Sequence, residues 1–454
     1  MGVGMNKNVI SVIDGEAGSC GKAKVIGEIA TDNTINLGAS ITNCMPNAGH
    51  TFVDERGNKH VFRNIPVSVV NPNTKLFIAP GSAIDMDIFK DEYSKVEHLL
   101  GDRKIYVHEM VPLIEQRHKQ YEKEHLKSGS TFKGCGAVSK DKLMRDPNLR
   151  FFETYKSAVR CTNEEWMNLL YDELDKDNTY VMLEGAQGCD LSLNHSNNYP
   201  YVTSRNVSTA QLLADSGISP ERLLETIMVI RPFPIRISNI TSSGDYIYSG
   251  RIGCGAELTW TQVNIAADQG SYPFEGDVDL YNNNLTQNKI RKLLSRSDEI
   301  ALKQVLGNNY RNIRIEDIKL IQVLELERLY YKRKGISTYE SDIIYYDNPH
   351  DFFITDLSEQ TTVTKMERRI FDLDIKQLNN NIRINSPYGL YLNFFQHLAL
   401  EYENESGNFS DFYFNKYIRN YIDWLEYKTK TDILALGTGA RNKKRILRES
   451  LIRR

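Results

Sequence analysis

The chain has 454 residues, enough to bury a large core in one or two domains. Its net charge of −3 provides no basic field for nucleic acid, and 41% hydrophobic and 25% charged residues are ordinary for a globular protein. No apolar run approaches the length of about eighteen residues that a membrane span needs, and the N-terminus lacks a signal-peptide pattern. We therefore expect a cytoplasmic protein with neither a nucleic-acid nor a membrane partner. The six cysteines show no paired spacing and the nine histidines no metal-ligand spacing, so no disulfide framework or zinc site is expected.

Apolar, strand-like runs alternate with helical patterns along the chain. The expected strands are Val9–Ile13, Lys75–Ile78, Tyr180–Leu183, Thr226–Ile230 and Asp432–Leu436, and the expected helices include Ser82–Leu100 and Glu164–Leu174. This alternation predicts an α/β fold with a largely parallel central sheet flanked by helices, whose strand ends bind ligands along one edge. We expect residues 1–454 to form one domain, with residues 270–360 as a helical elaboration inserted within it.

A glycine-rich turn, 14–24, follows the first expected strand and leads into a helical pattern. Backbone N–H groups, the helix dipole and the lysines Lys22 and Lys24 would together favour an anion there. The turn is not a Walker A motif, because Gly15 lies one residue too far from Gly21 and Ala23 stands where that motif has a hydroxyl. A purely structural turn remains the alternative when this segment is considered alone.

Further motifs follow the glycine-rich turn in a definite order. They are Asn47-Ala48-Gly49-His50-Thr51, Gly129–Gly136, Glu184-Gly185-Ala186-Gln187-Gly188 and Tyr199–Ser204. Together these segments resemble the adenylosuccinate synthetase family, which joins L-aspartate to C6 of IMP with GTP. The resemblance implies a carbon–nitrogen ligase that phosphorylates O6 of the purine, so that the amine of aspartate can displace it. Catalysis in such an enzyme depends on positioning and charge stabilisation.

The resemblance also implies roles for individual residues of this chain. The catalytic residues would be Ser19, Lys22 and His50. The nucleoside monophosphate would contact Ser19, Asn47, Ser130, Thr131, Arg145, Gln187 and Thr203. The triphosphate would contact Gly21, Lys22, Ala23, Lys24, Gly49, His50, Thr51, Gln396 and Gly437, and Mg²⁺ would lie at Ser19 and the Gly49 carbonyl. L-Aspartate would contact Thr362, Val363, Thr364, Arg368 and Arg369, since arginine forks pair with carboxylates.

Arg145 is implied to reach the 5′-phosphate in the neighbouring subunit, which makes the protein a homodimer with shared sites. The alternative for Arg145 is an ordinary surface arginine. Another alternative for the whole chain is that it is a catalytically inactive, nucleotide-binding homologue.

Ser19 departs from the family pattern, because the family has an aspartate there that binds magnesium and takes the N1 proton. A serine hydroxyl cannot serve as that base at neutral pH, but it leaves room for the 2-amino group of guanine and offers it an acceptor. This change resembles the bacteriophage branch of the family, the 2-aminoadenylosuccinate synthetases, which act on dGMP. If the chain is encoded by a phage, its location would be the cytoplasm of the infected host cell.

Gln396 is the second departure, because the family has a Thr-Lys-Leu-Asp sequence whose aspartate accepts from the guanine of GTP. An amide can donate to adenine N1 and accept from its 6-amino group, as a carboxylate cannot. The alternative is that Phe394–His397 is simply core with a polar end. We therefore expect a ligase that converts dGMP and L-aspartate with ATP or dATP, and the alternative enzyme is an ordinary adenylosuccinate synthetase using IMP and GTP.

Overall fold

The computed structural model describes residues 6–126, 130–239, 246, 248–258, 260, 263, 267, 359 and 368–453. Thr362, Val363 and Thr364 lie outside the described residues, as does the expected helical elaboration at 270–360 except for Glu359. The expectation of one domain with this insertion therefore stays a prediction.

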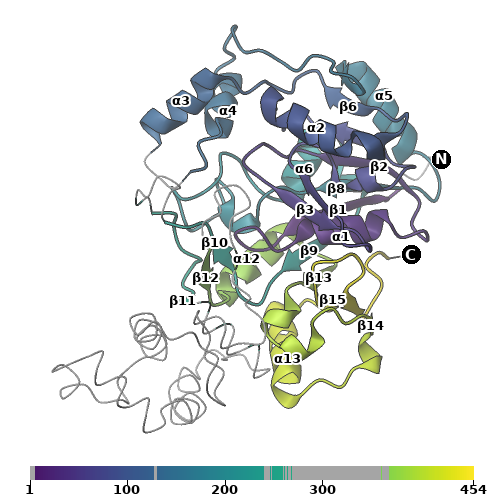
Figure 1. Ribbon diagram of the computed structural model, residues 1–454, viewed down its shortest axis with the longest axis vertical. Coiled ribbons are helices and arrows are strands. Elements are labelled where there is room, and N and C mark those ends of the chain that lie inside the picture. Colours follow the sequence, from purple (N-terminus) through teal and green to yellow (C-terminus); the bar gives the residue numbers. More distant parts are fainter. Residues whose placement is uncertain are drawn as a thin grey trace, which may run out of the picture.

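An eleven-stranded sheet forms the centre of the described part, in the order β14-β16-β15-β13-β9-β1-β8-β2-β5-β6-β7 (Figure 1). Its strands are β1 Val9–Asp14, β2 Leu37–Thr42, β5 Lys75–Ile78, β6 Ile105–His108, β7 Ala158–Cys161, β8 Tyr180–Glu184, β9 Leu223–Ile230, β13 Gly389–Leu392, β14 Gly407–Asn408, β15 Ile433–Gly437 and β16 Arg445–Leu447. Every neighbouring pair from β15 to β7 is parallel, and β16 runs antiparallel to β15. The predicted α/β class with a largely parallel sheet is confirmed.

The remaining elements surround this sheet. The helices are α1 Lys22–Ala30, α2 Met86–Leu100, α3 Gln116–His125, α4 Cys135–Leu143, α5 Asn163–Leu174, α6 Thr209–Ser216, α12 Ile375–Asn385 and α13 Lys416–Thr429. Short 3-10 turns are η1 Val67–Val70, η2 Cys189–Leu191, η3 Pro220–Arg222, η7 Phe395–His397, η8 Leu400–Tyr402 and η9 Phe409–Asp411. Smaller sheets pair β3 His50–Val53 with β4 Lys59–Phe62, and β12 Arg369–Phe371 with β10 Ile235–Arg236 and β11 Glu257–Leu258.

The central strand β1 is buried along its whole length, as a parallel strand covered on both faces must be. Its side chains alternate between two cores: Val9 and Ile13 belong to one, and Ile10 and Val12 to the other. Helices α5, α6, α12 and α13 contribute apolar side chains to the first core, whereas α1 and α2 contribute to the second. The sheet is therefore a rigid layer that fixes where its loops begin.

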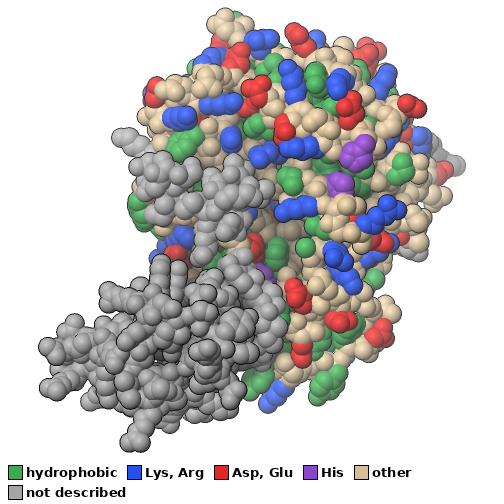
Figure 2. Space-filling view, in the orientation of Figure 1, with side chains coloured by type: hydrophobic (Ala, Val, Ile, Leu, Met, Phe, Trp, Pro, Cys, Tyr) green, Lys and Arg blue, Asp and Glu red, His purple; other side chains and the backbone are tan. Residues whose placement is uncertain are grey.

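The N-cap residues explain why two helices begin at positions that differ from those expected from the sequence. The helix expected over Ser82–Leu100 begins at Met86, because the Asp85 carboxylate accepts from the N–H groups of Asp87 and Ile88. Helix α5 begins after Thr162, which forms a capping box with Glu165. No helix among the described residues is long and apolar enough to cross a membrane. On the face shown in Figure 2, Lys and Arg side chains are interspersed with Asp and Glu.

Candidate active site

Loops from six parallel strands meet along the carboxyl edge of the central sheet. Segments 15–21, 43–49, 185–188, 231–234, 393–396 and 438–444 follow β1, β2, β8, β9, β13 and β15 respectively. Because these strands are neighbours in the sheet, the predicted glycine loop, His50, Gln187, Gln396 and Gly437 all lie at this edge. The fold therefore gathers most of the sequence-predicted nucleotide-binding residues on one side of the sheet.

The Asp14 side chain fixes the shape of the glycine loop. Its fully buried carboxylate accepts from the backbone N–H groups of Glu16, Gly18 and Cys20 at 3.0, 3.3 and 2.9 Å. Gly18 and Gly21 have positive φ, as does Ser19 at 60°, so the chain turns tightly around Asp14. Because these N–H groups point toward Asp14, they are not available to an anion. The N–H groups that could bind an anion are those from Gly21 onward, where α1 begins.

Neither carboxylate of this loop is placed as an open replacement for the family aspartate. Asp14 is enclosed by the backbone of the loop. Glu16 accepts from the Arg231 N–H at 3.0 Å and from the Cys20 thiol at 3.2 Å, and burial, followed by the nearby charge of Asp14, raises its pKa well above the usual value. Both groups therefore hold the loop together.

The two predicted phosphate lysines have different surroundings. Lys22 Nζ donates to the Gln187 carbonyl at 2.6 Å and lies 3.4 Å from the Asp14 carboxylate, so it joins two loops of the nucleotide edge. Lys24 Nζ donates to the Lys444 carbonyl at 2.6 Å and to the Tyr391 hydroxyl at 3.0 Å, and burial lowers its pKa. A direct phosphate contact of Lys24 stays a prediction that would require a change of partners.

His50 begins β3 and is almost completely buried, with an exposed fraction of 7%. Its ring nitrogens lie 3.8 and 3.9 Å from the Cys44 thiol. Burial, followed by the charge of Lys22, lowers the pKa of His50 to about 3. The imidazole is therefore neutral at physiological pH, and in the free protein it can act as a hydrogen-bond donor without carrying a charge of its own.

The neutral state of His50 predicts a specific pH dependence of stability. Because its folded pKa is lowered from 6.5 to about 3, the stabilisation from neutral burial is complete above pH 6.5 and lost as the pH falls. The difference in unfolding free energy between wild type and His50→Asn should shrink by about 2 kcal/mol between pH 7 and 5. Urea unfolding of both proteins measures it, and a difference that stays constant with pH would contradict a buried neutral His50.

Sequence reasoning missed a cluster that joins the glycine loop to residues 359 and 368. Arg231, fully buried directly after β9, forms a bidentate ion pair with Glu359, and its Nη1 donates to the Ser19 carbonyl at 3.2 Å. Arg368 Nη1 donates to Ser19 Oγ at 2.7 Å, and its N–H donates to the Glu359 carbonyl at 2.8 Å. A charged residue directly after the apolar run Ile227–Ile230 was the available signal for Arg231.

The predicted base-binding residues are partly buried and polar. Gln396, on η7, and Gln187 each have a buried Oε1 atom without a hydrogen-bond partner among the described residues. Phe394, which the resemblance aligns with the lysine of the family's Thr-Lys-Leu-Asp sequence, packs against the Arg231 guanidinium, which lies 4.1 Å from its ring centroid. A side chain at Gly437 would clash with Asn393, whose amide also donates to the Cys20 carbonyl at 2.9 Å. Asn393 thus fills the space between the glycine loop and β15.

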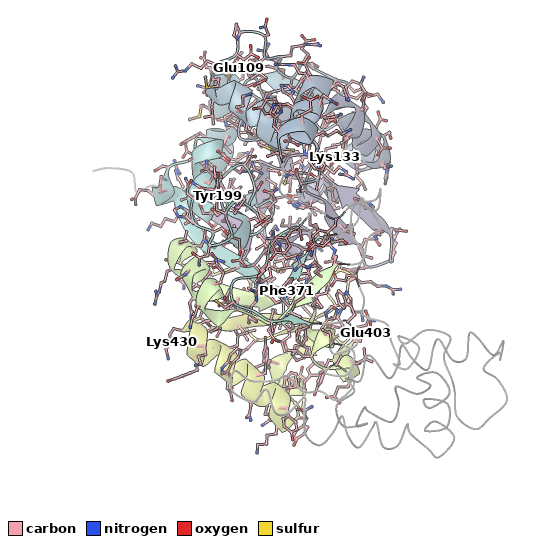
Figure 3. The ribbon with its side chains drawn as sticks, turned by 90° about the vertical axis from the view of Figure 1, so that its left-hand side faces the viewer. Glu109, Lys133, Tyr199, Phe371, Glu403 and Lys430 are labelled. Atoms are coloured by element: carbon pink, nitrogen blue, oxygen red, sulfur yellow. The ribbon has the colours of Figure 1, made fainter. Side chains whose placement is uncertain are left out.

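The predicted monophosphate residues are more dispersed. Ser130 is half-buried and Thr131 exposed, next to α4, whose first N–H groups are held by the Glu122 carboxylate. Asn47 and Thr203 are half-buried, and Arg145 is exposed at the end of α4 with a φ of 56°. Figure 3 labels Lys133, beside α4, well above Phe371 of β12. A single subunit therefore presents Arg145 at its surface.

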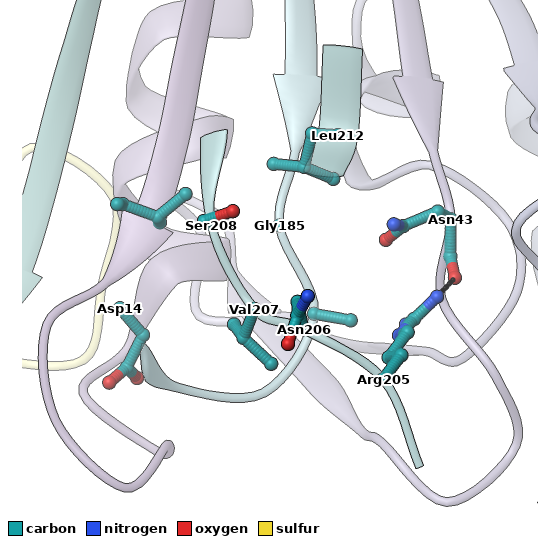
Figure 4. Close-up of a pocket in the computed structure, with 10 residues that line it drawn as sticks. Asp14, Asn43, Gly185, Arg205, Asn206, Val207, Ser208 and Leu212 are labelled. Carbon is teal, nitrogen blue, oxygen red and sulfur yellow. Dashed lines mark hydrogen bonds between the residues drawn. The ribbon is translucent and has the colours of Figure 1, made fainter. Parts of the chain in front are cut away.

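A small cavity lies beside Asp14 and the loop that follows Thr203 (Figure 4). Its lining includes Asn43, Arg205 and Ser208, and Arg205 Nη1 donates to the Asn43 carbonyl at 2.6 Å and to the Gly81 carbonyl at 3.0 Å. Arg205 thus ties the loop that carries Thr203 to the loop after β2. It was not among the residues that the sequence predicted.

The two predicted aspartate-binding arginines differ in how they are engaged. Arg369 pairs bidentately with Glu257 at 2.7 and 2.6 Å, and its Nη1 donates to Asn239, Ser249 and the Gly250 carbonyl. Arg368 faces Ser19. A carboxylate ligand of Arg369 would have to compete with Glu257, and one of Arg368 with Ser19 and with the Glu359 carboxylate, which lies 4.0 Å from its Nε.

Comparison with known proteins identifies the family. The model of the adenylosuccinate synthetase family matches residues 12–162 and 146–243, about half of the chain. The N6-succino-2-amino-2′-deoxyadenylate synthases of Vibrio phage phiVC8 and cyanophage S-2L are 36% and 32% identical over 270 and 278 residues, each alignment covering 57% of this chain and 74% of the relative. The adenylosuccinate synthetase of Pyrococcus horikoshii is 30% identical over 236 residues, 50% of this chain and 66% of that protein.

Solved structures agree on the fold. The cyanophage S-2L succinoaminodeoxyadenylate synthetase, bound to dGMP and dATP, matches with a TM-score of 0.64 and 21% identity, covering 97% of this chain and 95% of that one. Adenylosuccinate synthetase from Plasmodium falciparum matches with a TM-score of 0.60 and 18% identity, covering 97% and 100%. The chain belongs to the adenylosuccinate synthetase family. It is a ligase of the type that forms carbon–nitrogen bonds.

Proposed function

We propose that the protein joins L-aspartate to C6 of dGMP, with ATP or dATP as the phosphate donor. The γ-phosphoryl group is transferred to O6, the aspartate amine attacks C6, and phosphate leaves. The products are 2-amino-2′-deoxyadenylosuccinate 5′-phosphate, the nucleoside diphosphate and phosphate. The phage relatives, whose names specify the 2-amino-2′-deoxy product, support this proposal.

The observation that carries the proposal is the hydroxyl of Ser19, exposed at the nucleotide edge where the family has a carboxylate. A hydroxyl oxygen can accept from the 2-amino group that distinguishes guanine from hypoxanthine. Ser19 also lies within hydrogen-bond distance of Arg368, a proposed ligand of L-aspartate. The purine C2 position and L-aspartate would thus both bind next to Ser19.

Magnesium would be held with few protein ligands. Among the described residues, no group of three or more His, Cys, Asp or Glu side chains could hold a metal. The proposed ligands are the Ser19 hydroxyl and the Gly49 carbonyl, and apart from Gly49 and its two chain neighbours no described heavy atom lies within 4 Å of where a Cβ of Gly49 would be. This open position fits a Mg²⁺ ion that is coordinated mainly by phosphate oxygens and water, as is usual in nucleotide sites. The ion would neutralise phosphate charge.

The donor is expected to carry adenine because Gln396 is proposed to contact its base. Its amide matches the donor and acceptor of adenine, and a mismatch costs roughly 1–3 kcal/mol, which predicts about ten- to a hundredfold preference for dATP or ATP over GTP. Gln396→Asp should shift this preference toward GTP, though Phe394 in place of lysine limits the gain. Phosphate release with dGMP and L-aspartate fixed and the triphosphate varied measures it. A wild-type preference for GTP would place Gln396 away from the base.

Arg145 is expected to complete the site of a second subunit in a homodimer. Its exposure beside Leu143 and Met144, which are 81% and 73% exposed, supports an interface at the end of α4. Mixing inactive Arg145→Ala with inactive His50→Ala should restore about a quarter of the wild-type activity, since random exchange makes half the dimers mixed, each with one intact site. If the mixture stays inactive while subunits demonstrably exchange, Arg145 does not act in trans.

A substrate panel tests the proposed function. IMP, GMP and dGMP are each combined with ATP, dATP and GTP, and phosphate release that depends on L-aspartate is recorded with product masses. The proposal expects the highest rates for dGMP with dATP or ATP. Highest rates with IMP and GTP would indicate an ordinary adenylosuccinate synthetase, and no release with any pair would indicate an inactive homologue.

A further inference from the structure

Arg368 and Ser19 form a direct contact between the proposed amino-acid site and the proposed purine site. The Arg368 Nη1 to Ser19 Oγ distance is 2.7 Å. Both residues rest on the same support: Arg231 donates to the Ser19 carbonyl and pairs with Glu359, whose own carbonyl accepts from the Arg368 N–H. The buried Arg231 thus supports both the Ser19 backbone and the Glu359 segment that positions Arg368.

Neither side chain can serve its proposed substrate fully while this contact persists. A hydroxyl oxygen that accepts from a guanidinium has part of its acceptor capacity taken, and it accepts a second donor less well. The carboxylate of L-aspartate, being charged, is a stronger partner for a guanidinium than a neutral hydroxyl. Arrival of L-aspartate would therefore draw Arg368 away from Ser19.

We propose that Arg368 exchanges between Ser19 Oγ and the carboxylate of L-aspartate, so that L-aspartate and a purine with a 2-amino group each strengthen the binding of the other. This inference rests on the proposed function. With dGMP bound, the 2-amino group takes the Ser19 oxygen, and Arg368 is already released when L-aspartate arrives. With dIMP bound, C2 carries no donor, so L-aspartate must still break the Arg368–Ser19 contact.

The coupling has a definite size and symmetry. A net hydrogen bond of ordinary strength corresponds to about a two- to tenfold change in affinity. The dissociation constant of L-aspartate should be lower by that factor in the dGMP complex than in the dIMP complex. By linkage, L-aspartate should tighten dGMP by the same factor and leave dIMP unaffected. Ser19 would then select the purine, and the purine bound at Ser19 would change the affinity for L-aspartate.

Titration calorimetry of L-aspartate tests the exchange. The full-length protein is kept in metal-free buffer, so that no Mg²⁺ competes for the Ser19 hydroxyl, and is saturated with dGMP, with dIMP or with neither before L-aspartate is added. Wild type is compared with Ser19→Gly, which removes the hydroxyl while keeping the positive φ of that position. Ser94→Ala, at an exposed position on α2, is the matched control.

The expected result is tighter L-aspartate binding to the wild-type dGMP complex than to the dIMP complex, and no such difference in Ser19→Gly. In Ser19→Gly without a monophosphate, L-aspartate should bind about two- to tenfold tighter than in wild type, because one hydrogen-bond partner that competes for Arg368 is removed while the nearby Glu359 carboxylate is unchanged. Equal affinities in the wild-type dGMP and dIMP complexes, together with no effect of Ser19→Gly, would overturn the exchange. Failure of the proposed function is distinguishable, because it would appear in the substrate panel as rates that favour IMP and GTP, whereas the comparison without a monophosphate tests Arg368 and Ser19 alone.

Discussion

Replacing His50 with asparagine is expected to lower kcat by about 10²- to 10³-fold, the usual cost of removing one preorganised donor from a site of developing charge. The imidazole is buried and neutral, and the shorter asparagine side chain does not reach as far as the Nε2 atom of histidine. The value of KM for dGMP should change little, because most of the proposed monophosphate contacts lie on loops other than the one that carries His50. Steady-state phosphate release at saturating substrates measures the effect.

The matched control for His50 is His60→Asn on the neighbouring strand β4, where the side chain lies near Asp54 at the rim of the hairpin. His60→Asn should keep near-wild-type turnover. A loss of less than about threefold in His50→Asn would show that His50 is structural and does not contact the transferred group.

Replacing Asp14 with alanine is expected to lower the unfolding free energy by about 3–5 kcal/mol, as for other buried charged groups whose partners are left unpaired. The change would strip an acceptor from the N–H groups of Glu16, Gly18 and Cys20 and leave the Lys22 ammonium without its carboxylate. Urea unfolding with a comparable m-value measures this loss.

Asp14→Asn provides the graded comparison, because it keeps one acceptor oxygen and removes the charge. Its loss of stability should fall between that of wild type and Asp14→Ala. If Asp14→Ala costs less than about 1 kcal/mol, the glycine loop keeps its shape by other means and Asp14 has a different role.

The sequence predicted the sheet and its ligand-binding edge because these depend on local patterns. The mostly apolar β1 and the glycines after it are visible within about a dozen residues, and neighbouring parallel strands have their following loops at one edge of the sheet. Helix α5 was also predicted within one residue, since its capping box is local.

The partners within the site could not be predicted in the same way, because they come from distant segments. Arg231 meets Glu359 and the Ser19 carbonyl only after β9 is placed beside β1. The glycine loop was correctly expected to be a tight turn, but the direction of its N–H groups toward Asp14 depends on positive φ at Ser19. Lys24 looked like a phosphate ligand by position, yet Tyr391 and Lys444, from two C-terminal segments, hold its amine.

The ratio of kcat/KM for dGMP to that for dIMP, at saturating L-aspartate and dATP, tests the central claim most directly. The two nucleotides differ only in the 2-amino group that Ser19 is proposed to accept. An unsatisfied polar group at this position costs roughly 1–3 kcal/mol, so the account predicts a ratio of about ten to a hundred in favour of dGMP. A ratio of one or less would contradict the assignment of Ser19 as the residue that selects the purine.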